Sequence, residues 1–348
     1  MIVDKKYCAS SFLMYRTIAD RNKIFADGII PYYGAMPENR VPVHNSEELY
    51  ETLKLKISKI CKNKKAAICL SGGIDSAILA KFMPEGSIAY TFKCVVPGVQ
   101  VIDETQRASL YAKECNLQHR VIEIYWDDFN KYVPKLMLHK GAPIHSIEVQ
   151  IYKAAQQAKN DGFDTLIFGE SADCLYGGLS NILSKDWTFG EFVDRYSFVK
   201  PYYVLKESEL VLEPYKKYCK DGYIDVHDFY SNAFFNESVN SYLNACKLAN
   251  VEFFSPYAET ILAEPLDLSR IRSGENKYLV REVFNRLYKE FDIPPKTPMP
   301  RPMNEWLKEW KGPSRPEFIP NCVDNMTGDQ KWLVWALEKY FNLIFAEK

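Results

Sequence analysis

The sequence has no C-x-x-C pair, no excess of either charge and no long apolar run. Its nine cysteines are scattered along 348 residues, which argues against a zinc ribbon or a redox dithiol and favours reduced thiols. Because 44 basic residues balance 45 acidic ones, we do not expect a nucleic acid partner. No apolar run reaches about 18 residues and no targeting segment stands out, so we expect a cytoplasmic protein without a membrane partner.

What the chain does have is enough apolar sequence for a large core, since 47% of its residues are hydrophobic. Residues 1–45 show no sustained period and predict an irregular covering arm. Residues 46–184 predict an α/β domain, and residues 185–348 predict a mostly helical region with amphipathic segments around 235–246, 279–291 and 332–341.

Within the α/β part, short apolar runs of strand length alternate with segments of helical period. The strands are expected at 66–70, 88–92, 121–125 and 165–168, and the helices between them at 75–82, 103–115 and 146–160. This alternation predicts a parallel sheet whose ligands bind at the carboxyl ends of the strands. Candidate site residues should therefore follow the strands directly.

The first strand runs into Ser71-Gly72-Gly73-Ile-Asp75-Ser76. Consecutive backbone N–H groups at such a turn can hold a phosphate, and the glycines allow close approach and positive φ. The hydroxyls of Ser71 and Ser76 add donors, and Asp75 makes sense if Mg²⁺ bridges it to phosphate oxygens. The alternative is a plain strand-to-helix turn with a capping residue.

A second string, Gly169-Glu170-Ser-Ala-Asp173-Cys174, follows a later strand and ends in a Gly-Gly pair. Its two carboxylates would meet Asp75 at the same edge of the sheet. The alternative is a strand end followed by a helix cap and a glycine stop.

Together the two strings resemble the N-type ATP pyrophosphatases and, among them, the synthetase domain of asparagine synthetases and β-lactam synthetases. The resemblance runs from about Ser46 to about Trp306 and implies a PP-loop, HUP-like fold of the adenine-nucleotide α-hydrolase type. Only 45 residues precede the helix that we expect from about residue 46 to Cys61, so we expect no glutaminase domain of that family in this chain. Cys174 stands where the family has Glu, so the acidic group that the family has at this position is missing.

The resemblance also implies roles for individual residues. Asp75 and Asp173 would hold Mg²⁺ on ATP, and Glu170 would act as the general base. Lys296, within a proline-rich segment, would neutralise the departing pyrophosphate, with Arg301 as the alternative cation.

Further residues complete the expected ATP site. Leu70 and Phe92 would lie against the adenine, while Gly169 and Lys277 would belong to the ATP and pyrophosphate contacts. His139 and Lys140 lie where the family often has a basic residue that contacts substrate or phosphate.

The implied function is an AMP-forming amide synthetase that uses ATP to adenylate a small carboxylic acid. The second substrate would be ammonia or another amine, supplied freely or by a separate glutaminase or amine-supplying partner. Two alternatives stay open: an NAD-synthetase-like or RNA-modifying PP-loop enzyme, and a nucleotide-binding regulator without turnover. The substrates and the oligomeric state are also open.

Overall fold

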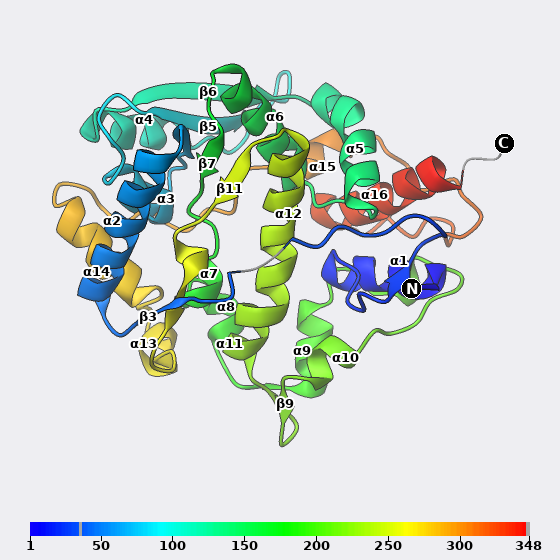
Figure 1. Ribbon diagram of the computed structural model, residues 1–348. Coiled ribbons are helices and arrows are strands. Elements are labelled where there is room, and N and C mark those ends of the chain that lie inside the picture. The colour runs from blue at the N-terminus through cyan, green and yellow to red at the C-terminus, as the bar shows by residue number, and fades with distance from the viewer. Residues whose placement is uncertain (35–36, 346–348) are drawn as a thin grey trace.

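The computed structural model describes residues 1–34 and 37–345, apart from the side chains of residues 233–236. A five-stranded sheet in the order β11-β7-β4-β5-β6 lies at its centre, and every pairing in it is parallel (Figure 1). The strands are β4 (Ala66–Cys69), β5 (Ile88–Cys94), β6 (Gln118–Ile124), β7 (Thr165–Ile167) and β11 (Glu252–Phe254). The predicted parallel α/β sheet is confirmed.

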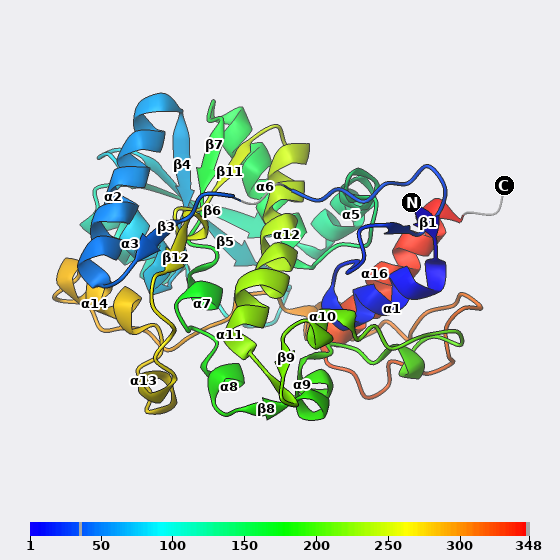
Figure 2. The same ribbon diagram turned by 60° about the horizontal axis from the view of Figure 1, so that its bottom comes forward.

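Each face of this sheet is covered by helices and buries its own apolar cluster. Along β4, Ala67 and Cys69 join one cluster while Ile68 and Leu70 join the other, as the alternation of a strand requires. One face carries α2 (Ser46–Asn63), α3 (Ile74–Ala80), α4 (Thr105–Glu114) and α14 (Tyr278–Leu287), and the other α5 (Trp126–Lys140), α6 (Ile147–Asn160) and α12 (Phe235–Leu248) (Figure 2). The fold is therefore a three-layer α/β/α sandwich.

The strand order reverses at the centre of the sheet. From β4 the chain moves outward through β5 to β6, and it then returns to the other side of β4 to form β7 and β11. In open parallel sheets, ligands bind outside the carboxyl ends of the strands where the order reverses. Both predicted site strings begin at this point, one after β4 and one after β7.

The C-terminal region is mostly helical, as predicted. Its helices include α9 (Phe189–Tyr196), α10 (Glu213–Lys216), α11 (Val226–Phe229), α13 (Leu268–Arg272), α15 (Met303–Trp306) and α16 (Gly328–Ile344). A small antiparallel sheet joins β8 (Trp187–Thr188), β10 (Tyr223–Ile224) and β9 (Cys219–Lys220). Because β11 and α12 from this region complete the central layers, the division after residue 184 stays a proposal about chain organisation.

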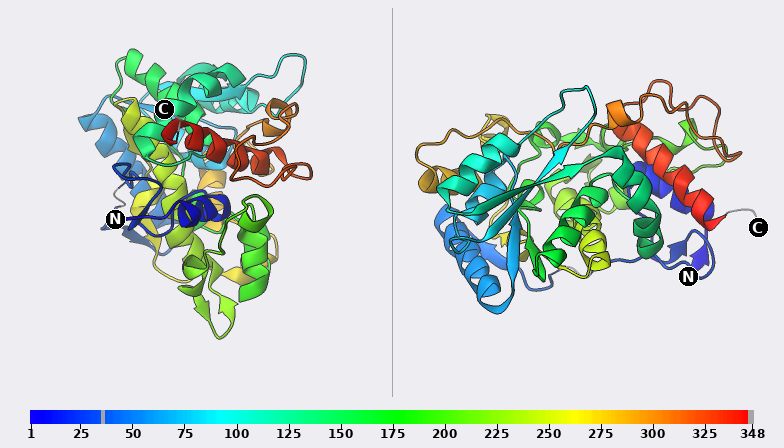
Figure 3. Two further views of the ribbon diagram at one scale, coloured as in Figure 1. Left: turned by 90° about the vertical axis from the view of Figure 1, so that its right-hand side faces the viewer. Right: turned by 90° about the horizontal axis from the view of Figure 1, so that it is seen from above.

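The N-terminal arm is not irregular throughout, and that expectation was wrong. It contains α1 (Lys5–Tyr15), in which every residue from Tyr7 to Tyr15 is buried. A helix buried on all sides has no single apolar face, so its sequence shows no amphipathic period. The helix packs beside α16 (Figure 3). Short parallel pairs join β1 (Ile2–Val3) to β2 (Lys23–Ile24) and β3 (Val41–Val43) to β12 (Thr260–Leu262).

Two other elements also lie outside the sequence expectations. The helix α5 continues through Pro134, a residue that removes one backbone hydrogen bond from a helix interior. Buried Phe129, Val133 and Leu136 hold it against the core. The edge strand β11 is only three residues long. None of the described helices combines the length and apolarity that crossing a bilayer requires.

Candidate active site

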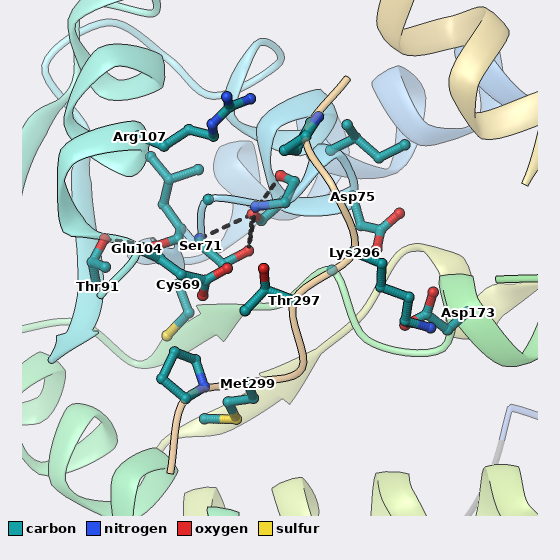
Figure 4. A pocket seen from close by; sticks show the side chains of 18 of the residues that line it. Cys69, Ser71, Asp75, Thr91, Glu104, Arg107, Asp173, Lys296, Thr297 and Met299 are labelled. Carbon is teal, nitrogen blue, oxygen red and sulfur yellow. Dashed lines mark hydrogen bonds and ion pairs between the residues drawn. The ribbon is translucent and has the colours of Figure 1, made fainter. Parts of the chain in front are cut away.

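A cleft of about 700 Å³ opens at the carboxyl ends of β4, β5 and β7. Its volume lies within the range usual for small-molecule sites. The turn after β4, the turn after β7 and the proline-rich segment 293–300 line it, and Figure 4 shows their side chains converging. Twelve of the predicted site residues lie in its lining: Leu70, Ser71, Gly72, Gly73, Asp75, Ser76, Phe92, Gly169, Glu170, Asp173, Lys277 and Lys296.

The turn after β4 is held in shape by its own hydroxyl groups. The N–H of Ser71 donates to the Ser76 hydroxyl at 3.0 Å, and the two serine oxygens lie 3.0 Å apart. The N–H of Gly73 donates to the Ser71 hydroxyl at 3.1 Å. These contacts are drawn as dashed lines in Figure 4. The turn therefore keeps its shape without a ligand.

The glycines of the site are required for space and not for positive φ. Gly73 has a φ of −87°, and Gly72 is not among the glycines with positive φ, so that part of the expectation was wrong. A Cβ at Gly72 would lie 3.3 Å from the Cβ of Glu104. At Gly169 it would lie 2.9 Å from the backbone nitrogen of Ser76. The turns after β4 and β7 thus pack backbone against backbone.

Two aspartates from these turns meet at one lysine. The ammonium nitrogen of Lys277 lies 2.6 Å from Asp75 Oδ2 and 2.8 Å from Asp173 Oδ1. Lys277 is only 7% exposed and holds a left-handed φ of 55° at the start of α14. Lys296 adds a second cation, 3.1 Å from Asp173 Oδ2. The cluster thus contains two carboxylates and two ammonium groups.

The two aspartates differ in acidity because they share these cations unequally. Burial, together with the charge of Asp173, raises the pKa of Asp75 although Lys277 opposes the shift. Burial acts on Asp173 in the same direction, but Lys277 and Lys296 outweigh it and lower the pKa of Asp173 to about 2. Attraction to both aspartates raises the pKa of Lys277 in spite of its burial. Asp173 is therefore firmly ionised.

The aspartate pair fits a magnesium ion that arrives with its polyphosphate. Asp75 Oδ1 is buried without a hydrogen-bond partner among the described residues, so its lone pairs are available to a cation. No group of three or more His, Cys, Asp or Glu residues suited to a metal occurs in the described ranges. Mg²⁺ commonly uses one or two carboxylates and takes its other ligands from water and phosphate.

Glu170 lies in the same cleft and is fixed at both its side chain and its backbone. Ser238 Oγ on α12 donates to Glu170 Oε1 at 2.8 Å, and Ser255 Oγ donates to its carbonyl oxygen at 2.7 Å. Burial raises the pKa of Glu170, while hydrogen bonds from Ser238 and Tyr242 act against that shift. A carboxylate with a raised pKa is a better proton acceptor, which suits a general base.

Cys174 is buried, at 5% exposure, and does not line the cleft. Burial raises the pKa of its thiol well above the usual value. This position therefore supplies no negative charge to the aspartate pair. All nine cysteines are free thiols, as expected.

Of the two candidate cations on the proline-rich segment, the structure brings only Lys296 into the cleft. Lys296 donates to the carbonyl of Gly178 at 2.7 Å. Arg301 instead pairs with Asp329 at 2.8 Å and does not line the cleft. Segment 291–302 has no regular secondary structure, as its prolines predict.

The expected adenine end has its backbone groups partly engaged. The N–H of Leu70 donates to the carbonyl of Tyr90 at 2.8 Å, and Thr91 Oγ1 donates to the carbonyl of Leu70 at 2.6 Å. Phe92 lines the same end. Any base recognition through Leu70 would therefore use the remaining lone pair of its carbonyl.

His139 and Lys140 do not reach the cleft, so the expectation of a substrate or phosphate contact there was wrong. His139 Nδ1 lies 2.7 Å from Asn244 Oδ1. Lys140 is 6% exposed and pairs with buried Glu148 at 2.6 Å. Both residues lie near the C-terminus of α5, among the helices that cover the sheet, and serve as internal contacts.

Two residues of the cleft were not predicted from the sequence. Glu104 faces the first turn, and burial raises its pKa to about 7 although the N–H of Gly72 donates to it. The sequence placed Glu104 at the start of the expected helix 103–115, but nothing there showed its distance from Gly72. Tyr242, on α12, donates to Glu170 and lines the cleft. Only the fold brings that helix to the end of β7.

Comparison with known proteins identifies the family. A putative glutamine-hydrolysing asparagine synthetase from Methanocaldococcus jannaschii is 27% identical over 148 residues, which are 38% of this chain and 26% of that protein. The match thus spans about a quarter of the curated relative's length.

Two solved structures show weaker likeness. NMN synthetase from Francisella tularensis is 14% identical, and the match covers 73% of this chain and 100% of the synthetase with a TM-score of 0.29. The U34-tRNA thiolase from Methanococcus maripaludis is 13% identical, and the match covers 87% of this chain and 90% of the thiolase with a TM-score of 0.29.

The model of the asparagine synthase family matches residues 57–261. That range is more than half of the chain and includes both turns that form the cleft. The chain therefore belongs to the asparagine synthase family.

Proposed function

We propose that this chain is an ATP-dependent, AMP-forming amide synthetase that adenylates a carboxylic acid and then joins it to ammonia or another amine. Family membership supports an ATP-using synthetase. The observation that carries the finer proposal is the meeting of Asp75 and Asp173 at Lys277, beside the turn after β4 and in one cleft with Glu170. That arrangement combines a place for a triphosphate with a proton acceptor.

In the first step, a carboxylate oxygen of the substrate attacks the α-phosphorus of ATP, and the bond to pyrophosphate breaks. Backbone N–H groups at the start of α3, where a first helical turn leaves donors without intrahelical partners, hold the β and γ phosphates, and Lys296 offsets the charge that develops on the leaving group. Mg²⁺ between Asp75 and Asp173 would neutralise phosphate charge when bound. Adenylation turns a poor acyl donor into one with a good leaving group.

In the second step, the amine attacks the activated carbonyl carbon and AMP leaves. Glu170 accepts the proton that the nitrogen loses as the C–N bond forms. Ser238 orients the Glu170 carboxylate through its hydrogen bond at 2.8 Å. A position fixed in this way allows proton transfer without rearrangement of the base.

Family membership does not determine which compound supplies the nitrogen. The curated relative is named as glutamine-hydrolysing and is much longer than the matched segment. We propose that this chain takes ammonia from solution or from a separate glutaminase, or takes an organic amine directly.

The test is product analysis with purified chain, ATP, Mg²⁺ and a panel of carboxylic acids with ammonia or simple amines. We expect AMP and pyrophosphate in equal amounts, released only when an acid is present. Release of ADP and phosphate would contradict the proposal. Trapping an acyl-adenylate for mass spectrometry would identify the acid.

A nucleotide-binding regulator without turnover is the second candidate. It is favoured by Lys277, which already neutralises both aspartates, and by Cys174, which supplies no acidic group. This reading predicts that ATP binds but that no acid in the panel stimulates release of pyrophosphate. It also predicts that Glu170→Gln leaves the biological activity intact.

A further inference from the structure

A second cavity, of about 600 Å³, lies between the N-terminal arm and the region around α9 to α12. Residues 7–33 form one side of it and residues 196–240 the other. Figure 2 shows α1 next to α10, with α12 closing the side towards the sheet. None of the residues assigned to the cleft lines this cavity.

The inner walls of the cavity are aromatic. They are formed by Tyr7, Tyr15, Tyr33, Tyr196, Tyr218 and Phe229. All of these except Tyr33 are at most 7% exposed. Aromatic faces carry partial negative charge and attract cations, so walls of this kind favour a positively charged ligand with a flat or apolar body.

The cations that line the cavity are already engaged by this chain. Lys23 pairs with Asp4 at 2.8 Å and lies 3.8 Å from the centre of the Tyr7 ring. The guanidinium of exposed Arg21 lies 4.9 Å from the centre of the Tyr33 ring. The ammonium nitrogen of exposed Lys217 lies 5.3 Å from the centre of the Tyr218 ring. An anionic ligand would have to compete with these partners.

Glu237 is the most deeply buried of the charged side chains described as lining the cavity, with 4% exposure. One of its oxygens, Oε2, lies 3.2 Å from Arg16. The other, Oε1, is buried and has no hydrogen-bond partner among the described residues. A buried carboxylate oxygen without a partner carries a desolvation cost that a bound donor would offset.

We propose that this cavity binds an organic primary amine, with its ammonium group against Glu237 Oε1 and its carbon body against the aromatic walls. The free acceptor has the sign and the burial that an ammonium donor needs, and the volume is far larger than a water molecule requires. A carboxylate or phosphate has no proton to donate to Glu237 Oε1.

The test is calorimetric titration of the full chain, without ATP, with 2-phenylethylamine as the probe. The matched anion is 3-phenylpropanoate, which has the same ring and chain length. We expect the amine to bind and the anion not to compete. Glu237→Gln should weaken amine binding at least about tenfold, because a charge-assisted hydrogen bond is lost. Equal binding of the anion, or unchanged binding by Glu237→Gln, would overturn the proposal.

Because Glu237 is buried beside Arg16, its substitution can also disturb folding, and a second variant then decides. Ala19 lines the cavity without belonging to the Arg16 contact, and Ala19→Trp should fill part of the space and weaken amine binding at least about tenfold. Leu55→Trp, on the exposed side of α2, is the matched control and should bind normally. Normal binding by folded Ala19→Trp would overturn the proposal.

Discussion

The cleft and the aromatic cavity both contain buried carboxylates, but these are neutralised differently. In the cleft, Asp75 and Asp173 share Lys277, and Asp173 also contacts Lys296. In the cavity, Glu237 meets Arg16 through one oxygen and leaves the other without a partner. Each region thus keeps a carboxylate oxygen without a hydrogen-bond partner among the described residues, Asp75 Oδ1 in the cleft and Glu237 Oε1 in the cavity, but two lysines hold the cleft carboxylates and one arginine holds Glu237.

This difference suggests opposite ligands for the two regions. A metal ion between the aspartates would release lysines that can then hold phosphate groups, so the cleft suits a metal-bound anion. The cavity offers aromatic faces and one free carboxylate oxygen, so it suits a cation. The two sites should therefore be separable by mutation.

The largest expected separation comes from Asp75→Asn. Losing one of the paired carboxylates removes a candidate Mg²⁺ ligand and leaves Lys277 with Asp173 alone. We expect acid-dependent release of pyrophosphate to fall about 10³-fold. Calorimetric binding of 2-phenylethylamine should change less than about twofold. Loss of both would mean that the two regions are not separate.

A matched control for that variant is Asp329→Asn. Asp329 also pairs with a cation, Arg301, but that pair lies outside the cleft lining. Its side chain is largely exposed, so the pair should contribute little to stability. We expect pyrophosphate release within about twofold of the parent chain.

Glu170→Gln should divide the two chemical steps within the cleft. The amide keeps the shape of the side chain but cannot accept the proton from the attacking nitrogen. We expect amide formation to fall at least about 10²-fold, while acid-dependent exchange of pyrophosphate into ATP is retained. Glu259→Gln, which alters a carboxylate paired with Lys56, is the control and should leave both rates unchanged. Equal loss of both rates by Glu170→Gln would contradict its role as base.

The parts of the fold that the sequence predicts are those with a local pattern. The strands β4 and β7 are short apolar runs that end in turn residues, a local pattern that is visible without the fold. The helix α1 is buried on every side and therefore shows no period. The strand β11 is too short to be distinguished from a loop, and only its pairing with β7 defines it.

The candidate site divides in the same way. Ser71 to Ser76 and Glu170 to Asp173 form two continuous strings, so their placement at one sheet edge follows from a parallel sheet. Tyr242 reaches Glu170 from a distant helix, which no local pattern reveals. The aromatic cavity joins a segment before β4 to one between β7 and β11, from Tyr7 to Asn240, and no local pattern in the sequence indicates it.

Gly169→Ala tests whether the two turns of the cleft form one rigid unit. Its Cβ would lie 2.9 Å from the backbone nitrogen of Ser76, so one turn has to move. We expect the free energy of unfolding to fall by about 1–3 kcal/mol, measured by urea denaturation. Gly190→Ala is the control, because nothing lies within 4 Å of its Cβ position in α9. If both variants are equally stable, the backbone contact between the turns is not rigid.

The smallest effect concerns Ser238, the residue between the cavity and the base. Its hydroxyl stabilises ionised Glu170 and so opposes the rise in pKa that burial causes. The base acts when ionised, so amide formation should fall as the pH drops through that pKa. Ser238→Ala removes the opposing hydrogen bond, raises the pKa further and should move the acidic limb of the kcat profile upward by about one pH unit.

Ser255→Ala is the control for the pH shift expected in Ser238→Ala. Ser255 donates at 2.7 Å to the carbonyl oxygen of Glu170 and not to its carboxylate. Removing that bond loosens the backbone of the turn but changes no hydrogen bond to the carboxylate, so the pKa of Glu170 should stay the same. We therefore expect the acidic limb to stay in place while kcat itself falls. If both serine variants moved the acidic limb equally, Ser238 would act only by positioning Glu170. The predicted effect of its hydroxyl on the pKa of Glu170 would then be contradicted.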